Sequence, residues 1–181
     1  MDDGAFGPSS ASASRRLAVG VTPRICTGAG LRPNSTNATA VDTATACLIN
    51  RVRVTFGLHP LRINHYLQGV ANGQVKLMVR WNYFADVRPS GQTPAALIAS
   101  TRYAKHAASL STGENIGWAA GSDDTPASMV GAWMQSPAHR AVILAGGFHD
   151  FGVGVAPALP SVLQQSERGS TYAVEFAARA S

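Results

Sequence analysis

A carboxylate and an imidazole stand in the two most distinctively patterned segments of this chain. Glu114 lies in the tetrapeptide GENI at 113–116, and His139 lies in the pentapeptide SPAHR at 136–140. A glutamate and a histidine together can perform general acid–base catalysis, bind a metal ion or hydrogen-bond to each other inside a protein wall. We favour a structural role for Glu114, either capping backbone amides or pairing with His139, because no nucleophile accompanies it. For His139, a structural role and a role in a cleft both stay open.

The remaining polar candidates favour structural interpretations. Ser136 precedes Pro137, and this order is typical of a helix cap rather than of a nucleophile. His149 precedes a predicted strand, and we expect it in a surface loop rather than at the rim of a cleft. Three further histidines show no metal-binding spacing with one another or with His139: His59, His65 and His106. We expect the tryptophans in the core and in cleft walls: Trp81, Trp118 and Trp133.

The composition is that of an ordinary globular domain. The 181 residues are 45% hydrophobic and 14% charged, with 18 glycines and 10 prolines, so the chain can bury a sizeable core and makes many turns. The net charge of +5 does not predict nucleic-acid binding, because the arginines are scattered and form no basic run among aromatic residues. Weak attraction to anionic polymers or lipid headgroups is all that this charge implies.

Several features bear on the compartment in which the protein resides. No apolar stretch approaches the roughly 20 residues of a membrane helix, so we do not expect an integral membrane protein. The start, Met1 to Gly4, is acidic and lacks the apolar region of a signal peptide, which indicates either a cytosolic protein or a start that differs from the natural precursor. The cysteines Cys26 and Cys47 leave two alternatives open, a disulfide formed in an oxidising compartment or two buried thiols. A disulfide would close a loop of about 20 residues and add on the order of 3 kcal/mol.

Helix signals precede strand signals along the chain. Residues 1–24 are rich in Ser, Ala and Gly without a hydrophobic period, which predicts a flexible tail before one domain at 25–181. Periodicity and capping signals predict helices at these places: 39–55, 64–82 with Asn64 as the cap, from Thr93-Pro94, and from Thr125-Pro126. Alternation predicts strands over 114–119, 151–155 and 172–176, with loops at 86–92 and 158–171. This order predicts an α+β domain with helices packed on a small sheet.

Several motifs in a consistent order resemble the CAP superfamily of cysteine-rich secretory, antigen 5 and pathogenesis-related proteins. The resemblance is to its bacterial SCP-like extracellular branch, and it covers roughly residues 40 to 178. The motifs are CLINR at 47–51, GLHPL at 57–61, YFAD at 83–86, GENI at 113–116, WMQSPAHRAVIL at 133–144 and FGVGV at 151–155. The resemblance implies a three-layer α–β–α sandwich with a small antiparallel sheet, export from the cytoplasm, a surface cleft, and a disulfide between Cys26 and Cys47.

Many CAP proteins line that cleft with two histidines and two acidic residues. By motif position Glu114 matches one acidic residue and His139 matches the second histidine. Asp86 stands where the first histidine is expected, and Ser136 stands at the second acidic position. The resemblance therefore implies a cleft formed by these four residues, with three neighbours: Asn115, Arg140 and His149.

The loss of one histidine weakens the expectation of a metal site. Zinc prefers neutral imidazoles supported by carboxylates or thiolates, so His139 with Asp86 and Glu114 would hold a divalent ion with poor selectivity for zinc. No other cofactor is predicted. In an alternative arrangement Asp86 accepts a hydrogen bond from His139 or pairs with Arg140.

Two functions follow as expectations. The first is a secreted or cell-envelope CAP protein without enzymatic activity, monomeric, that binds a lipid, a sterol or an envelope component through the cleft. The second is a divalent-metal-assisted hydrolase or protease that uses Glu114 and His139. The incomplete set of cleft residues favours the first function.

Overall fold

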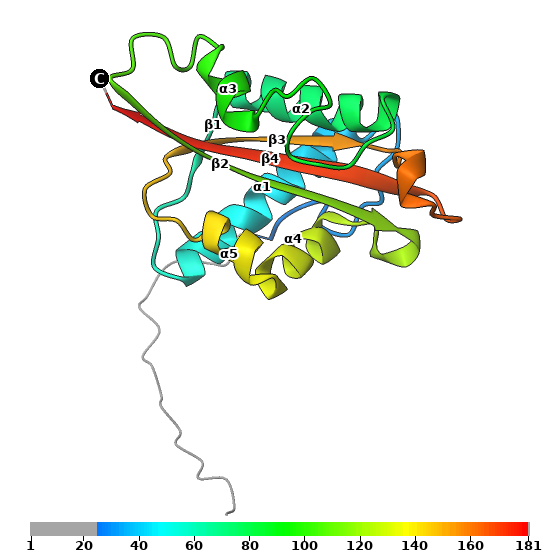
Figure 1. Ribbon diagram of the computed structural model, residues 1–181. Coiled ribbons are helices and arrows are strands. Elements are labelled where there is room, and N and C mark those ends of the chain that lie inside the picture. The colour runs from blue at the N-terminus through cyan, green and yellow to red at the C-terminus, as the bar shows by residue number, and fades with distance from the viewer. Residues whose placement is uncertain (1–24, 181) are drawn as a thin grey trace, which may run out of the picture.

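The computed structural model describes residues 25–180, and the predicted tail at 1–24 lies outside the described residues. One sheet is enclosed between two layers of helices, as Figure 1 shows. Two helices cover one face, α2 (His65–Arg80) and α3 (Pro94–Ala99). Three cover the other face, α1 (Ala38–Thr55), α4 (Pro126–Gln135) and α5 (Pro137–Ile143). This arrangement confirms the predicted α–β–α sandwich.

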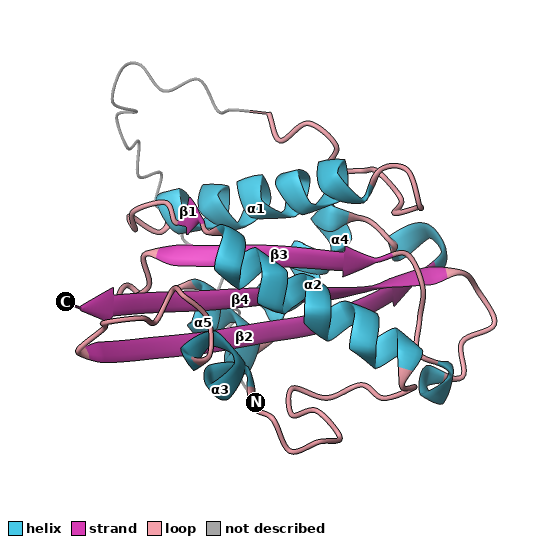
Figure 2. Ribbon diagram, turned by 90° about the horizontal axis from the view of Figure 1, so that it is seen from above, coloured by secondary structure: helices cyan, strands magenta, loops and turns pink. Residues whose placement is uncertain are grey.

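The sheet has four strands in the order β1-β3-β4-β2 (Figure 2). The strands are β1 (Arg62–Ile63), β2 (Ser109–Ala120), β3 (Asp150–Ala156) and β4 (Gly169–Ala180). The three long strands pair antiparallel, as predicted, but β1 pairs parallel with β3. The sequence did not predict β1, because two residues are too few to show alternation. Two single-turn 3-10 helices complete the fold, at Gly121–Asp123 and Ser161–Leu163.

The capping signals in the sequence form as predicted. The Asn64 side chain accepts a hydrogen bond from the Tyr66 amide at 3.0 Å and so caps α2. Thr93 and Thr125 cap α3 and α4 in the same way, each just before a proline. β2 is longer than the predicted 114–119, because its first residues at 109–113 gain strand structure by pairing with β4 along their whole length.

Two glycines in the FGVGV motif let α2 approach the sheet closely. A Cβ atom placed on Gly152 would overlap the backbone of Gln68, and one on Gly154 would overlap the backbone of Ala71. The small and large residues of β3 therefore point to opposite faces of the sheet. The glycines face α2, whereas Phe151 and Val153 pack in the core on the α1 side.

Long-range links tie the helices on the α1 face together. The disulfide between Cys26 and Cys47 is formed and joins the segment before α1 to that helix, which confirms the expectation drawn from the family resemblance. The guanidinium of Arg53, only 1% exposed, donates to the Ile143 carbonyl at 2.7 Å and to the Ala145 carbonyl at 3.0 Å. The C-terminus of α1 is thereby fixed to the end of α5.

The tryptophan prediction was partly wrong. Trp133 is buried and donates through Nε1 to the Ile116 carbonyl at 3.0 Å, as expected of a core residue. Trp81 is 49% exposed and Trp118 is 37% exposed. Trp81 follows the last residue of α2, beyond its apolar stripe, and Trp118 lies on the edge strand β2. Neither indole ring is fully buried at such a position.

Candidate functional site

The GENI segment sends its side chains to both faces of the sheet. Successive residues of a strand point to opposite sides. Ile116 packs with Ala71 and other residues of α2, so Glu114, two residues earlier, also faces α2. Asn115 points the other way, and its amide donates to the His139 carbonyl at 3.0 Å. Glu114 and His139 therefore lie on opposite faces of the sheet.

His139 makes its side-chain contact within its own segment. Its Nδ1 lies 2.8 Å from the Ser136 hydroxyl oxygen at the junction of α4 and α5. Ser136 occupies the N-cap position of α5, as predicted, but its side chain forms no capping hydrogen bond. The predicted cap position is confirmed, and the Ser136 hydroxyl contacts the His139 imidazole instead of the helix amides.

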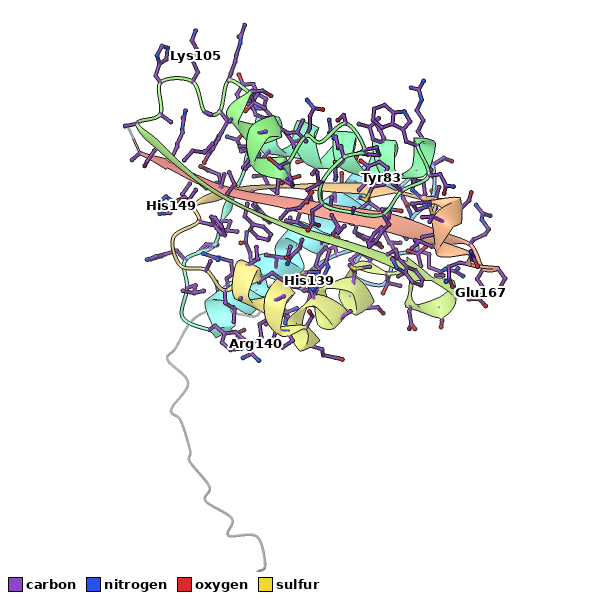
Figure 3. The ribbon with its side chains drawn as sticks, viewed as in Figure 1. Tyr83, Lys105, His139, Arg140, His149 and Glu167 are labelled. Atoms are coloured by element: carbon purple, nitrogen blue, oxygen red, sulfur yellow. A yellow bond between two sulfur atoms is a disulfide. The ribbon has the colours of Figure 1, made fainter. Side chains whose placement is uncertain are left out.

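Asp86 lies in the segment between α2 and α3, on the Glu114 side. Gln74 of α2 donates to the backbone carbonyls of Ala85 at 3.1 Å and Asp86 at 3.0 Å. The structure thus places Asp86 with Glu114 and Ser136 with His139. Figure 3 shows this division, with Tyr83 of the Asp86 segment on one side of the sheet and His139 and Arg140 on the other.

The ion and hydrogen-bond pairs expected among these residues do not form. Within residues 25–180 neither Asp86 nor Glu114 bonds to His139, and the one ion pair joins Arg62 and Asp150 at 3.1 Å. The sheet separates the predicted partners. Arg140 instead places its guanidinium over the ring of Phe56, 5.3 Å from the centroid.

The predicted metal ligands do not fit a shared ion. No three His, Cys, Asp or Glu side chains in the described part of the chain lie close enough together to hold one. His139 is on one face of the sheet and Glu114 on the other, so they cannot complete one coordination sphere. His149 is exposed just before β3, which agrees with the predicted surface loop.

A second glutamate faces Glu114 and was not predicted as a site residue. Glu175 of β4 lies directly opposite Glu114 in the antiparallel register, and all four carboxyl oxygens are buried without a hydrogen-bond partner. Burial raises the pKa of both carboxyl groups, and the charge of Glu175 adds to the rise at Glu114. The signal in the sequence was the single acidic residue within the apolar strand YAVEFA.

An apolar depression lies on the other face, between α1 and α4. It has a volume of about 580 Å3. Its walls are Leu48, Arg51, Val52, Thr55, Phe56, Ala127, Val130, Gly131, Met134 and Arg140. A smaller depression of about 310 Å3 continues it along α5 and shares Met134 and Arg140. We call these two depressions the α1–α4 groove.

Only Arg140 of the predicted cleft residues lines the α1–α4 groove. The apolar wall residues of the groove were not predicted. The sequence could have indicated two of them, Val52 and Phe56, because their spacing of four residues places them on one face of a helix. Their exposure could not be read from that spacing, since buried helix faces show the same pattern.

Comparison with known proteins identifies the family. The model of the cysteine-rich secretory protein (CAP) family matches residues 47–159, which is more than half of the chain. The chain belongs to the CAP family. The matched residues include α1 from Cys47 onward, the GENI segment and the α4–α5 pair, so the motifs that suggested the resemblance lie within the matched region.

Sequence similarity extends to a bacterial protein. YkwD of Bacillus subtilis (strain 168) is 36% identical over 107 residues, which are 59% of this chain and 39% of that protein. The chain therefore spans well under half of this relative's length.

Solved structures share the fold. An outer surface protein from Borrelia burgdorferi superposes with a TM-score of 0.61 at 18% identity, covering 83% of this chain and 99% of the other. An extracellular SCP-domain protein from Bacillus anthracis str. Ames superposes with a TM-score of 0.59 at 23% identity, covering 80% of this chain and 44% of the other.

No helix within residues 25–180 is long and apolar enough to cross a membrane.

Proposed function

We propose that this CAP domain is an extracellular, non-enzymatic module that binds a fatty acid in the α1–α4 groove. The observation that carries the proposal is the pairing of an apolar trough with two arginines at its walls, Arg51 and Arg140. The disulfide supports an oxidising compartment. Two relatives in fold, described as an outer surface protein and an extracellular protein, support the same location.

The apolar walls supply the driving force for an acyl chain. Val52, Met134 and Phe56 present hydrocarbon and sulfur to the groove, and Phe56 is 51% exposed. Full burial of an exposed side chain of this size contributes about 1.5–3 kcal/mol, so covering one that is half exposed contributes roughly half of that. A groove of about 580 Å3 also lies within the usual range for small-molecule sites.

The two arginines give the groove a preference for an anionic head group. No carboxylate within residues 25–180 forms an ion pair with Arg51 or Arg140, since the one ion pair is elsewhere. Arg140 is held over Phe56 at 5.3 Å from its centroid, so its guanidinium sits at the edge of the apolar surface. A guanidinium binds a carboxylate through two parallel hydrogen bonds.

The geometry favours binding over hydrolysis. Glu114 and His139, the acid–base candidates, are divided between the two faces of the sheet, so they cannot act together on one substrate. The α1–α4 groove contains no pair of groups able to transfer a proton between them. Binding is the chemistry that its residues support.

The test is the affinity for a dansylated undecanoic acid, measured by the rise in dansyl fluorescence. We expect the Phe56→Ala variant to bind about tenfold more weakly, because it removes part of the apolar contact. Arg51→Glu combined with Arg140→Glu should weaken binding by a similar factor through charge repulsion. The methyl ester of the same probe should lose the sensitivity to charge reversal but keep the sensitivity to Phe56→Ala.

Matched controls lie on the other side of the sheet. Trp81→Ala removes an aromatic side chain of similar exposure at the end of α2, and Lys76→Glu reverses an exposed charge on the same helix. Both should bind the probe as the wild type does. The proposal is wrong if the wild type gives no saturable fluorescence, or if all four changes alter binding equally.

A further inference from the structure

The layer between the sheet and α2 contains the densest set of unpartnered buried polar atoms. They are both oxygens of Glu114, both oxygens of Glu175 and the hydroxyl of Tyr83. Buried polar atoms in folded proteins nearly always have a partner, so five in one place require an explanation. The site is separate from the α1–α4 groove, which lies on the opposite face of the sheet.

Register brings the two carboxyl groups together. Glu114 and Glu175 are directly opposed across β2 and β4, and opposed side chains of an antiparallel pair have Cβ atoms about 4.5–5.5 Å apart. Glu175 is fully buried, and its neighbour on β3 is Gly152, which has no side chain to pair with it. Each carboxyl group therefore has the other as its directly opposed neighbour across β2 and β4.

The segment 82–92 between α2 and α3 closes over the pair; we call it the 82–92 loop. Gln74 anchors this loop, donating to the Ala85 and Asp86 carbonyls and accepting from Arg88 Nε at 3.1 Å. The Arg88 charge lowers the pKa of both glutamates, whereas the Asp86 charge raises both. The start of the loop is also held, because the Asn82 side chain accepts from the Val162 amide at 2.6 Å and Tyr83 and Phe84 pack against the core. Gln74 is the side chain of α2 that hydrogen-bonds to the middle of the loop.

We propose that Glu114 and Glu175 share one proton beneath the 82–92 loop, and that loss of this proton releases the loop from the sheet. With one proton present, the pair carries a single negative charge that faces Arg88. Without it, two carboxylates lie side by side in a dry site. Two like charges cannot both stay ionised there without water, and lifting the loop is the shortest way to admit it.

The sign of the pH dependence follows from burial. A carboxyl group whose pKa is raised in the folded state is stabilising while it is protonated, and that contribution is lost as the pH rises through its folded-state pKa. The charged or titratable groups that face the pair come from the loop: Tyr83, Asp86 and Arg88. Arg88 is the only cation among them. The loop is therefore closed at acidic pH and opens at alkaline pH.

The first measurement is the titration of the glutamate side chains by carbon-13 NMR. The chain has three glutamates, and the third, Glu167, is exposed. We expect at least one member of the buried pair to keep its proton beyond about pH 6. If Glu114 and Glu175 both lose their protons in the acidic range, the shared proton does not exist and the proposal is overturned.

The second measurement is the carbon-13 chemical shift of Gln74 Cδ, followed by NMR as the pH is raised. The Gln74 side chain donates to the Ala85 and Asp86 carbonyls and accepts from Arg88, so this shift reports whether the 82–92 loop is in place. Burial raises the pKa of Glu114 to about 10, so the shift should change in the wild type as the pH passes through that value. The double variant Glu114→Gln, Glu175→Gln should show no such change, and Glu167→Gln should behave as the wild type. A constant Gln74 shift in the wild type, or a change that survives in the double variant, would overturn the release of the loop. The NMR titration needs no variant, so a folding failure leaves the shared proton testable.

Discussion

At the scale of single residues, this CAP domain buries several ionisable groups without giving them a compensating charge. Glu114 and Glu175 are two of these ionisable groups, and Asp42 of α1 is a third. Asp42 is 8% exposed, and one carboxyl oxygen has no partner while the other lies 3.4 Å from Gln68 Nε2. Burial raises the pKa of Asp42 to about 7. Each of these groups makes the folded state less stable when it ionises.

Replacement of Asp42 by asparagine should stabilise the protein at pH 8 but not at acidic pH. The folded-state pKa is raised, so the wild type loses stability as the pH rises from about 4 to about 7, where the unfolded chain is already ionised. The asparagine variant has no such loss. We expect a gain on the order of 2 kcal/mol at pH 8 in urea unfolding, falling to about zero near pH 4.

Asp123→Asn provides the control for this prediction, since Asp123 is exposed. Its free energy of unfolding should follow the wild type at every pH within about 0.5 kcal/mol. An equal gain in both variants would show that net charge, rather than burial of Asp42, determines the pH dependence.

At the scale of elements, close packing of α2 on β3 fixes the position of the layer that holds the carboxyl pair. Gly152 and Gly154 allow this approach, and the backbone of α2 occupies the space that their Cβ atoms would need. The 82–92 loop begins at the end of α2. The distance between α2 and the sheet therefore also determines where the loop can close.

Gly152→Ala should therefore destabilise the protein by about 3 kcal/mol or more, because a rigid backbone rather than a flexible side chain is in the way. The matched change is Gly69→Ala, within α2 itself, where a Cβ atom meets nothing within 4 Å. That change should stabilise by roughly 0.5–1 kcal/mol, since alanine favours helix over glycine. Thermal unfolding of the two variants measures both effects, and equal shifts in midpoint would contradict the packing argument.

At the scale of the whole molecule, the sheet separates two chemically different regions. The α1–α4 groove is apolar with arginines at its walls, whereas the layer beneath α2 holds buried acids. Binding in the groove and proton release beneath the 82–92 loop can consequently be measured independently. The disulfide and Arg53 both act on the groove side, where the disulfide holds the middle of α1 and Arg53 holds its C-terminal end.

Removal of the disulfide should lower the stability of the molecule without changing its fold. Cys26 and Cys47 are 21 residues apart, and closing a loop of this size constrains the unfolded chain by about 3 kcal/mol. We expect urea unfolding of the double variant Cys26→Ser, Cys47→Ser to give a free energy of unfolding lower by about that amount. Labelling of the unreduced, unfolded wild type should find no free thiol, and two reactive thiols would contradict the bond.

The sequence by itself determined the order of the elements, the caps at Asn64, Thr93 and Thr125, the sandwich and the family. These depend on local spacing and on short motifs, which are visible along the chain. It did not determine that GENI divides between two faces, that Glu175 meets Glu114, or that α1 and α4 leave a groove. Strand register and helix packing join residues far apart in the chain, and a one-residue shift of register would turn every side chain to the other face. Only the tertiary structure could therefore show that Glu114 pairs with a second glutamate instead of His139.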